Sequence, residues 1–177
     1  LIIADKSEII YDDKMSRILT TPRYTAYVKV AEGCDNRCAY CVIPLVRGNF
    51  RSRTIESIVA ETKNLVKNGV KEINLIAQDT TNYGIDLYGE IKILELLKEL
   101  VKIEDLKWIR LLYCYPKRFT DELLNFMATE PKICKYIDLP LQHAHNDVLK
   151  AMARQDTKEE IEDLFLRIRN IMPTATI

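Results

Sequence analysis

The sequence of 177 residues lacks several features that mark particular classes of protein. Its 26 basic and 26 acidic side chains leave no net charge, which argues against a protein that grips nucleic acid mainly through phosphates. It has no run of about 18 apolar residues, so no membrane-spanning helix is expected. The amino terminus, LIIADKSEII, lacks the basic region and cleavage site of a signal peptide. We therefore expect a cytoplasmic protein without a membrane partner.

Cysteine is scarce, and its five copies are unevenly spread. Cys34, Cys38 and Cys41 fall within eight positions, whereas Cys114 and Cys134 stand alone. An odd number of cysteines, three of them crowded into one segment, does not fit the disulfide framework of a secreted protein. The pattern favours a metal site or catalysis.

Strand and helix patterns alternate along most of the chain, whose 47% of hydrophobic residues suits one globular domain. Thr54, Thr120 and Thr157 are expected to cap helices, and Glu160 stands at capping-box spacing from Thr157. Alternation of strands and helices predicts a parallel sheet with right-handed crossovers. Strands are expected within residues 20–30, 71–77, 107–116 and 135–142, with a fifth beginning at 174, and helices within 54–68, 90–103, 120–130, 147–154 and 157–172.

Two regions are expected. Residues 1–21 are interpreted as a linker or the remnant of a strand, and residues 22–177 as the domain proper. Five strand units without a closing element predict an α/β fold that is a partial, incomplete TIM-like βα barrel with helices outside.

The clustered cysteines directly follow the first predicted strand, and in parallel βα folds functional groups gather beyond the carboxyl ends of the strands. Their spacing, C-x-x-x-C-x-x-C, lets three thiolates surround one inorganic centre, and soft sulfur ligands suit Fe–S clusters and zinc. A closed zinc site or an electron-transfer cluster usually has four protein ligands. Three cysteines therefore favour an Fe–S cluster with one open iron, at which a substrate or cofactor binds.

A non-catalytic module with a closed zinc site remains the alternative from another class. Cys114, Cys134, His143 or His145 would then supply the fourth ligand. A lone cysteine in an apolar strand pattern is more often a small buried hydrophobe. We expect that role for both lone cysteines and a structural role for His143.

The segment EGCDNRCAYCVIP, residues 32–44, resembles the signature of the radical S-adenosylmethionine (SAM) enzymes. The resemblance implies that Cys34, Cys38 and Cys41 bind a 4Fe–4S cluster, with Tyr40 at the aromatic position beside the cofactor. It also implies that the open iron binds the amino and carboxylate groups of SAM, and that an electron from the reduced cluster cleaves SAM to methionine and a deoxyadenosyl radical.

A longer pattern, covering residues 22 to about 155, resembles the methylthiotransferases of that superfamily. It comprises YVKVAEGCDNRCAYCVIPLVRGNFRSR, IAQDTTNYGIDLYG, WIRLLYCYP and YIDLPLQHAHNDVLKAMAR. QDTTNYG is similar to the branch that adds a methylthio group to the β-carbon of an aspartate in a small-subunit ribosomal protein, whereas the tRNA-modifying branch usually has a sequence like GQNVNAY. The resemblance implies a ribosomal protein as substrate and a reducing electron donor as partner, with tRNA adenosine methylthiolation as the alternative.

Full-length methylthiotransferases contain further domains. The family carries an amino-terminal domain with a second 4Fe–4S cluster, linked to sulfur delivery, and a carboxy-terminal β-barrel, and neither pattern occurs in these 177 residues. We expect the second cluster only in such an additional domain. By itself, this segment is expected to cleave SAM weakly at most and to leave the ribosomal substrate unmodified.

Polar residues at the predicted strand ends are further cofactor candidates. Gln78 and Asp79 end the second strand, where an amide or carboxylate can meet the ammonium group of a bound amino acid, although such residues also cap turns in long loops. Gln142, at the end of the fourth strand, is a candidate for the cofactor ribose.

A basic stretch follows the cysteines. Arg53, together with Arg47 and Arg51, is placed to hold the cofactor carboxylate or an anionic partner, although a solvated basic loop has the same composition. Three aromatic residues, Trp108, Tyr113 and Tyr115, are expected to pack under the barrel without a chemical role.

Overall fold

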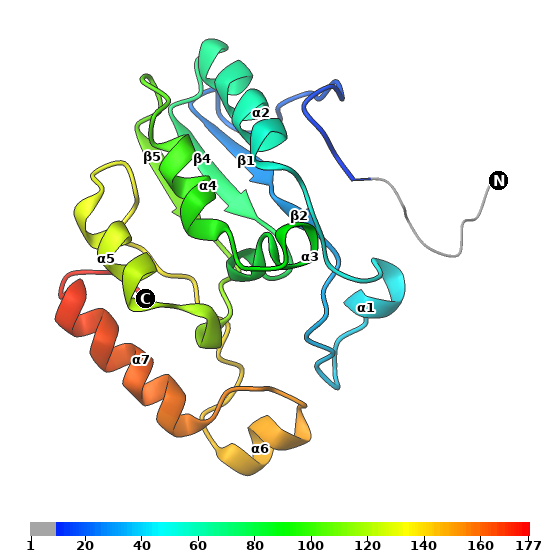
Figure 1. Cartoon of the computed structure of the whole chain (residues 1–177), viewed down its shortest axis with the longest axis vertical. Coiled ribbons are helices and arrows are strands. Elements are labelled where there is room, and N and C mark those ends of the chain that lie inside the picture. Colours follow the sequence, from blue (N-terminus) through cyan, green and yellow to red (C-terminus); the bar gives the residue numbers. More distant parts are fainter. Residues whose placement is uncertain (1–9) are drawn as a thin grey trace.

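The computed structural model describes residues 10–177 of the chain. Its centre is a sheet of three parallel strands in the order β1–β4–β5 (Figure 1). The strands are β1 (Thr25–Lys29), β4 (Glu72–Ile76) and β5 (Trp108–Leu111). The predicted parallel α/β fold is confirmed.

Helices supply the connections that parallel strands require. After β1 comes α2 (Ile55–Lys67), after β4 comes α4 (Ile93–Leu100), and after β5 comes α5 (Asp121–Thr129). The helices α2 and α4 lie side by side over one face of the sheet (Figure 1). The chain ends with α6 (Asn146–Ala151) and α7 (Lys158–Ile171), and α7 packs against α5. None of the helices within residues 10–177 is long and apolar enough to cross a membrane.

The predicted helix starts are confirmed. The hydroxyls of Thr54, Thr120 and Thr157 each accept a hydrogen bond from the backbone N–H three residues further on. Thr157 and Glu160 form the predicted capping box, because the Glu160 carboxylate also accepts from the Thr157 N–H. These bonds satisfy donors that would lack a partner at a helix start.

The helix predicted over residues 90–103 begins later and ends earlier than expected. The chain between β4 and α4 instead forms a turn of 3₁₀ helix, η1 (Thr80–Asn82), and a single helical turn, α3 (Ile85–Tyr88). The Lys92 N–H donates to the Tyr83 carbonyl at 2.7 Å, which closes this loop before α4 begins. A second 3₁₀ turn, η2 (Pro116–Arg118), follows β5.

The fourth and fifth predicted strands are wrong as extended strands. Residues 133–136 and 176 contribute only isolated parallel bridges, Ile109 with Ile133 and Tyr136 with Thr176. Pro140 has no N–H to donate to a ladder, and Gln142 has a φ of +70°, so the extended run ends there. The sheet therefore stays open past β5, in agreement with the predicted partial barrel.

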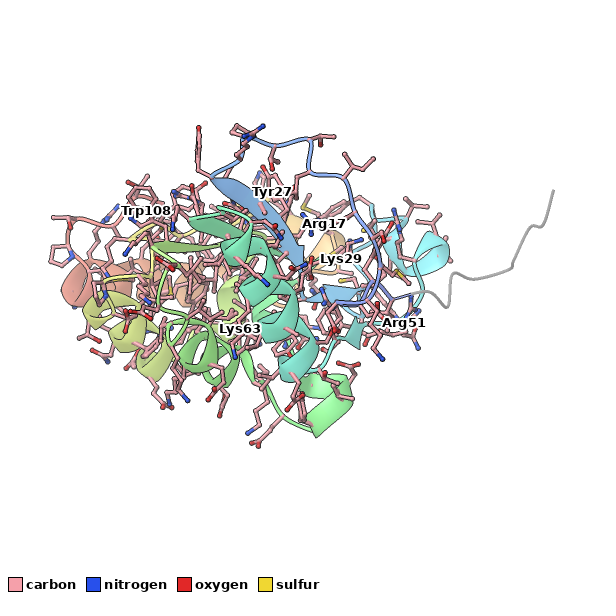
Figure 2. All side chains as sticks on the ribbon, turned by 90° about the horizontal axis from the view of Figure 1, so that it is seen from above. Arg17, Tyr27, Lys29, Arg51, Lys63 and Trp108 are labelled. Atoms are coloured by element: carbon pink, nitrogen blue, oxygen red, sulfur yellow. The ribbon has the colours of Figure 1, made fainter. Side chains whose placement is uncertain are left out.

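The two faces of the sheet differ in polarity. The side chains on one face are apolar, pack under the helices and are fully buried. The side chains that alternate with them along the strands lie on the other face and are more polar. The first set comprises Ala26, Val28, Ile73, Leu75, Ile109 and Leu111. Figure 2 shows Tyr27 and Lys29 on the side of β1 that faces away from α2 and its Lys63. A parallel sheet covered on one face fits an incomplete barrel.

Trp108 corrects a prediction on this open face. Its side chain, at the start of β5, is 55% exposed, so it does not pack under the barrel. The next segment along, around Ile133, contributes only an isolated bridge to β5 and does not extend the sheet beside Trp108.

Residues 10–21 contain neither helix nor strand. Arg17 forms an ion pair of 2.6 Å with Glu61 of α2, and the Lys29 ammonium lies 4.9 Å from the centre of the Tyr11 ring. This segment therefore packs against the domain instead of continuing its sheet. Half of the possible strand remnant at residues 8–11, namely residues 8 and 9, lies outside the described residues.

Candidate functional site

A short hairpin holds both ends of the segment that carries the clustered cysteines. Strand β2 (Ala31–Glu32) pairs antiparallel with β3 (Arg51–Ser52), directly after β1. Residues 33–50 form the cysteine loop between them, which includes the helical turn α1 (Ile43–Val46). The hairpin therefore fixes the loop at the carboxyl end of the sheet, where the sequence predicts a site.

Two backbone hydrogen bonds tie the cysteine loop to other parts of the chain. The Cys34 N–H donates to the Gly48 carbonyl at 3.2 Å, which draws the two arms of the loop together. The Ala39 N–H donates to the Met152 carbonyl at 2.9 Å, at the end of α6. The loop is thus fastened to the last part of the domain as well as to its first strand.

A cavity of about 600 Å³ lies beside the cysteine loop, over the ends of β1 and β4. It brings together six of the ten residues predicted as cluster ligands or cofactor contacts. These six are Cys34, Cys38, Tyr40, Cys41, Gln78 and Gln142. A volume of this size suits a small-molecule cofactor.

The thiols of the cysteine loop differ in burial. Cys34 is buried, whereas Cys38 and Cys41 are half-buried. Burial raises the pKa of the Cys34 thiol, and the charges of Asp79 and of the other two cysteines add to this rise, while the Asn36 backbone N–H opposes it. Thiolates are the form that binds iron, so metal binding at this site must release protons.

The donor set fits a cluster better than a single ion. Within residues 10–177, no three Cys, His, Asp or Glu side chains lie close enough together to hold one metal ion. The three thiols instead stand around one cavity. That arrangement suits a cluster, because each cysteine of an Fe–S centre binds a different iron atom.

Two polar side chains of the cavity keep buried atoms without a partner in the described part of the chain. They are the Gln78 carbonyl Oε1 and the Arg154 Nε. Gln78 follows β4, whereas Arg154 follows α6. Such buried polar atoms are costly unless a ligand or water satisfies them. An amide oxygen and a guanidinium can meet the ammonium and the carboxylate of an amino acid.

Arg154 is a residue that sequence reasoning missed. Its Nη2 donates to the Pro140 carbonyl at 3.2 Å and to the Asp156 carboxylate at 3.1 Å, and its guanidinium stacks 4.1 Å from the centre of the Tyr115 ring. These contacts fix the guanidinium beside the Cys38 side chain. The sequence holds no spacing signal that would single out this arginine from the others.

Tyr113 and Tyr115 also differ from their predicted positions. Both line the cavity instead of packing beneath the barrel. Tyr113 is 54% exposed. Tyr115 is buried, and its hydroxyl oxygen accepts a hydrogen bond from the Gln155 N–H at 3.0 Å. Burial raises the pKa of Tyr115 to about 12, so it stays protonated at neutral pH.

Within residues 10–177, four residues other than glycine have a positive φ, and each lines the cavity or is the chain neighbour of a residue that does. They are Arg37, Tyr113, Gln142 and Ala153. A left-handed backbone costs such residues about 1 kcal/mol or more each, and strained positions of this kind concentrate at functional sites. The backbone therefore marks the same cavity as the cysteines do.

Two of the predicted cofactor contacts lie outside the cavity lining, Arg53 and Asp79. The buried Arg53 donates from Nη1 to the Lys29 carbonyl at 2.8 Å and to the Glu61 carboxylate at 2.5 Å. Asp79 is buried and accepts a hydrogen bond from Asn36 of the cysteine loop at 2.9 Å.

The other arginines of the basic stretch also lie outside the lining. Arg47 lies 3.6 Å from the Glu32 carboxylate, and Arg51 donates to the Arg47 carbonyl at 3.1 Å. The stretch is therefore engaged with its own hairpin.

The proposed fourth ligands of a zinc site are scattered. Cys114 is buried, as expected, and Cys134 is half-buried. His143 and His145 are exposed, and each accepts through Nδ1 a hydrogen bond from the backbone N–H two residues further on. None of these four side chains lines the cavity.

Cys114 leads to a prediction about alkaline stability. Burial raises the pKa of its thiol well above the ordinary 9.0, and the charges of Asp79 and Asp138 add to the rise. Above pH 9 the unfolded chain releases this proton while the folded chain keeps it, so the free energy of unfolding falls as pH rises, by up to about 1.4 kcal/mol per pH unit. Urea unfolding under reducing conditions at pH 8 and pH 10 measures the loss. Cys114→Ala should lose less stability over this interval, and an unchanged loss would contradict the assignment.

Comparison with known proteins now places the chain in a family. Residues 28–177 match the model of the radical SAM superfamily, and the chain belongs to that superfamily. Membership implies a 4Fe–4S cluster and SAM as cofactors.

Two curated relatives share one name. The chain is 62% identical, over 95% of its length, to ribosomal protein uS12 methylthiotransferase RimO of Desulforamulus reducens. It is 55% identical, over 97% of its length, to the protein of the same name from Desulfitobacterium hafniense. The chain spans only 38% and 39% of the lengths of these relatives.

Solved structures support the fold. The structure of the radical SAM methyltransferase TsrM from Kitasatospora setae, with tryptophan and a SAM analogue bound, matches with a TM-score of 0.67 and 19% identity. The match covers 95% of this chain and 33% of that one. Another structure of TsrM, with cobalamin and a 4Fe–4S cluster bound, matches with a TM-score of 0.64 and 20% identity over 82% of this chain and 29% of that one.

Proposed function

We propose that this chain is the cluster-binding core of a radical SAM methylthiotransferase that modifies an aspartate of ribosomal protein uS12 at its β-carbon. The observation that carries the proposal is the 62% identity to a relative of that name over 95% of the chain. In this proposal Cys34, Cys38 and Cys41 are the cluster ligands, and residues 22–177 are the core domain.

Different side chains around the cavity would bind different parts of the cofactors. The three thiolates would each hold one iron of the cluster and leave one iron for SAM. Gln78 and Arg154 would supply a buried acceptor and a buried donor for the polar end of SAM, and Tyr40 and Gln142 would contribute the polar groups of the remaining wall. When bound, the reduced cluster supplies the electron that cleaves SAM. Ile43, Ile76 and Tyr115 add apolar or aromatic wall, which helps to keep water away from a reactive centre.

The names of the relatives support a ribosomal protein as the substrate. A reducing electron donor and a cytoplasmic location are part of the same proposal. The relatives are more than twice as long as the matched segment, so we assign the second 4Fe–4S cluster to parts of the enzyme outside residues 22–177.

A chimaera tests the substrate. In the relative from Desulforamulus reducens, the matched segment is replaced by this chain, and the purified protein is incubated anaerobically with SAM, a reductant and either uS12 or tRNA. Mass spectrometry should detect a methylthio group on an aspartate of uS12 and no change in the tRNA. The chimaera with all three clustered cysteines replaced by alanine is the control without product. A methylthiolated tRNA, or no product from a chimaera that holds its full iron complement, would contradict the proposal.

A further inference from the structure

We infer that Asn36, Asp79 and Arg118 form a positioning clamp that holds the cysteine loop in its cluster-binding shape and thereby sets how long the cluster is retained. This inference rests on the proposed function, because it assigns the cluster to the cysteine loop. None of the three is proposed as a cluster ligand.

Three hydrogen bonds join the three side chains in a closed ring. The Asn36 Nδ2 donates to the Asp79 Oδ2 at 2.9 Å, and the Arg118 Nε donates to the same oxygen at 3.0 Å. The Arg118 Nη2 donates to the Asn36 Oδ1 at 3.0 Å, which completes the ring. Each pair of side chains is therefore held directly and also through the third.

The ring joins three segments that are distant in the sequence. Asn36 lies in the cysteine loop between Cys34 and Cys38, whereas Asp79 follows β4 and Arg118 ends η2. Asn36 lines the cavity, whereas Asp79 and Arg118 do not belong to its lining. The clamp therefore connects the ligand-bearing loop to the carboxyl ends of two neighbouring strands without occupying the cofactor space.

Burial makes these contacts costly to lose. The Asp79 side chain is only 1% exposed and the Arg118 side chain 23%. The remaining Asp79 oxygen, Oδ1, accepts from the Thr81 hydroxyl at 2.9 Å, so both carboxylate oxygens are satisfied. Removing one partner of a buried ion pair leaves the other charge uncompensated. The cysteine loop then loses the restraint midway between its first two cysteines.

Outer groups that orient metal ligands typically change metal affinity by about tenfold or more when they are removed. We therefore expect Arg118→Ala, after anaerobic reconstitution with iron and sulfide, to lose its cluster to an iron chelator about tenfold faster than the wild type. The loss is followed by the visible absorption of the cluster. Arg110→Ala is the matched control, because Arg110 also pairs with a carboxylate, that of Glu72, which begins β4 at the opposite end of that strand from Asp79. It should release the cluster at the wild-type rate.

A swap of the two shorter partners separates positioning from general destabilisation. Asn36→Asp places two carboxylates face to face, and Asp79→Asn removes the charge that pairs with Arg118. In the double variant the amide of residue 79 donates to the carboxylate of residue 36, which also accepts from the Arg118 Nη2. Two of the three ring bonds and the ion pair return. The double variant should therefore retain its cluster longer than either single variant. In the cluster-free protein, backbone hydrogen exchange of the cysteine loop should likewise be slower in the double variant than in either single variant.

The outcomes distinguish a failure of the proposed function from a failure of the clamp. A wild-type protein that takes up no cluster would contradict the proposed function. A wild-type protein that binds a cluster, with Arg118→Ala retaining it equally well, would overturn the clamp alone. If Arg118→Ala does not fold, as judged by circular dichroism, the swap decides. A double variant whose cluster loss equals the combined effect of both single changes would overturn the clamp, because coupled partners should not be additive.

Discussion

Replacing Gly33 by alanine is expected to remove the iron–sulfur cluster from this protein while leaving the sheet folded. Gly33 precedes the first cysteine of the cysteine loop and has a φ of +79°. A Cβ at this position would lie 2.1 Å from the Asn49 carbonyl oxygen and 2.7 Å from the Gly48 carbonyl oxygen. Both obstacles are backbone atoms, so the two arms of the loop must separate. The hydrogen bond from the Cys34 N–H to Gly48 would then break.

The Gly33→Ala variant should lose much of its iron but little of its secondary structure. We expect Gly33→Ala to retain at most about a tenth of the wild-type iron after anaerobic reconstitution, consistent with the sensitivity of metal sites to their supporting groups. Far-ultraviolet circular dichroism checks that the helices remain. Gly89→Ala is the matched control, since Gly89 has a φ of +77° and nothing lies within 4 Å of its added Cβ. That variant should lose about 1 kcal/mol of stability and keep its iron. Equal iron contents in the two variants would contradict the role of the close approach.

Alanine at all three clustered cysteines is expected to abolish cluster binding. The wild-type protein should take up about four irons and four sulfides, and electron paramagnetic resonance of the reduced protein should shift when SAM is added, because the open iron accepts the cofactor. The triple variant has no thiolate left at the cavity and should show neither signal. Its fold should survive, since the three residues lie on a loop outside the apolar core cluster.

Cys134→Ala provides the comparison for the cysteine variants. Cys134 is also half-buried but lies outside the cavity, so its loss should leave iron content and the response to SAM unchanged. If the triple variant still binds iron, or if Cys134→Ala loses its iron, the cluster must be bound by other residues than the three clustered cysteines. Uptake of zinc without iron by the wild type would favour the zinc module that the sequence left open.

The parallel sheet and its helices are predictable because local signals repeat along the chain. Thr54, Thr120 and Thr157 mark helix starts through a single side-chain oxygen, and the apolar runs before them need burial on a sheet. The strand expected at 135–142 is wrong for two reasons. Pro140 and the positive φ of Gln142 end the extended run locally, and the chain around Ile133 and Tyr136 pairs with its neighbours only through isolated bridges.

The candidate site was predictable where sequence spacing carries the chemistry. Cys34, Cys38 and Cys41 are close in sequence, so their shared cavity follows from any loop that contains them. Arg154 was not predictable, because its place beside Cys38 depends on how α6 returns to the cysteine loop. From the sequence, Asp79 is predicted as a cofactor contact at a strand end. Its partners, Asn36 in the cysteine loop and Arg118 in η2, are brought to it only by the tertiary fold.

The hydrogen bond between Ala39 and Met152 affects the order of events during synthesis. The ribosome releases the cysteine loop early, whereas α6, Met152 and Arg154 emerge much later, and the amino-terminal part of a chain is available to fold first. Until then, the thiols sit on a chain segment whose far anchor does not yet exist. Iron and sulfide supplied at that stage would meet three reactive thiols without a shaped cavity. If the cysteine loop holds the cluster, we expect insertion only after Arg154 has emerged from the ribosome, when the loop has acquired both of its anchors.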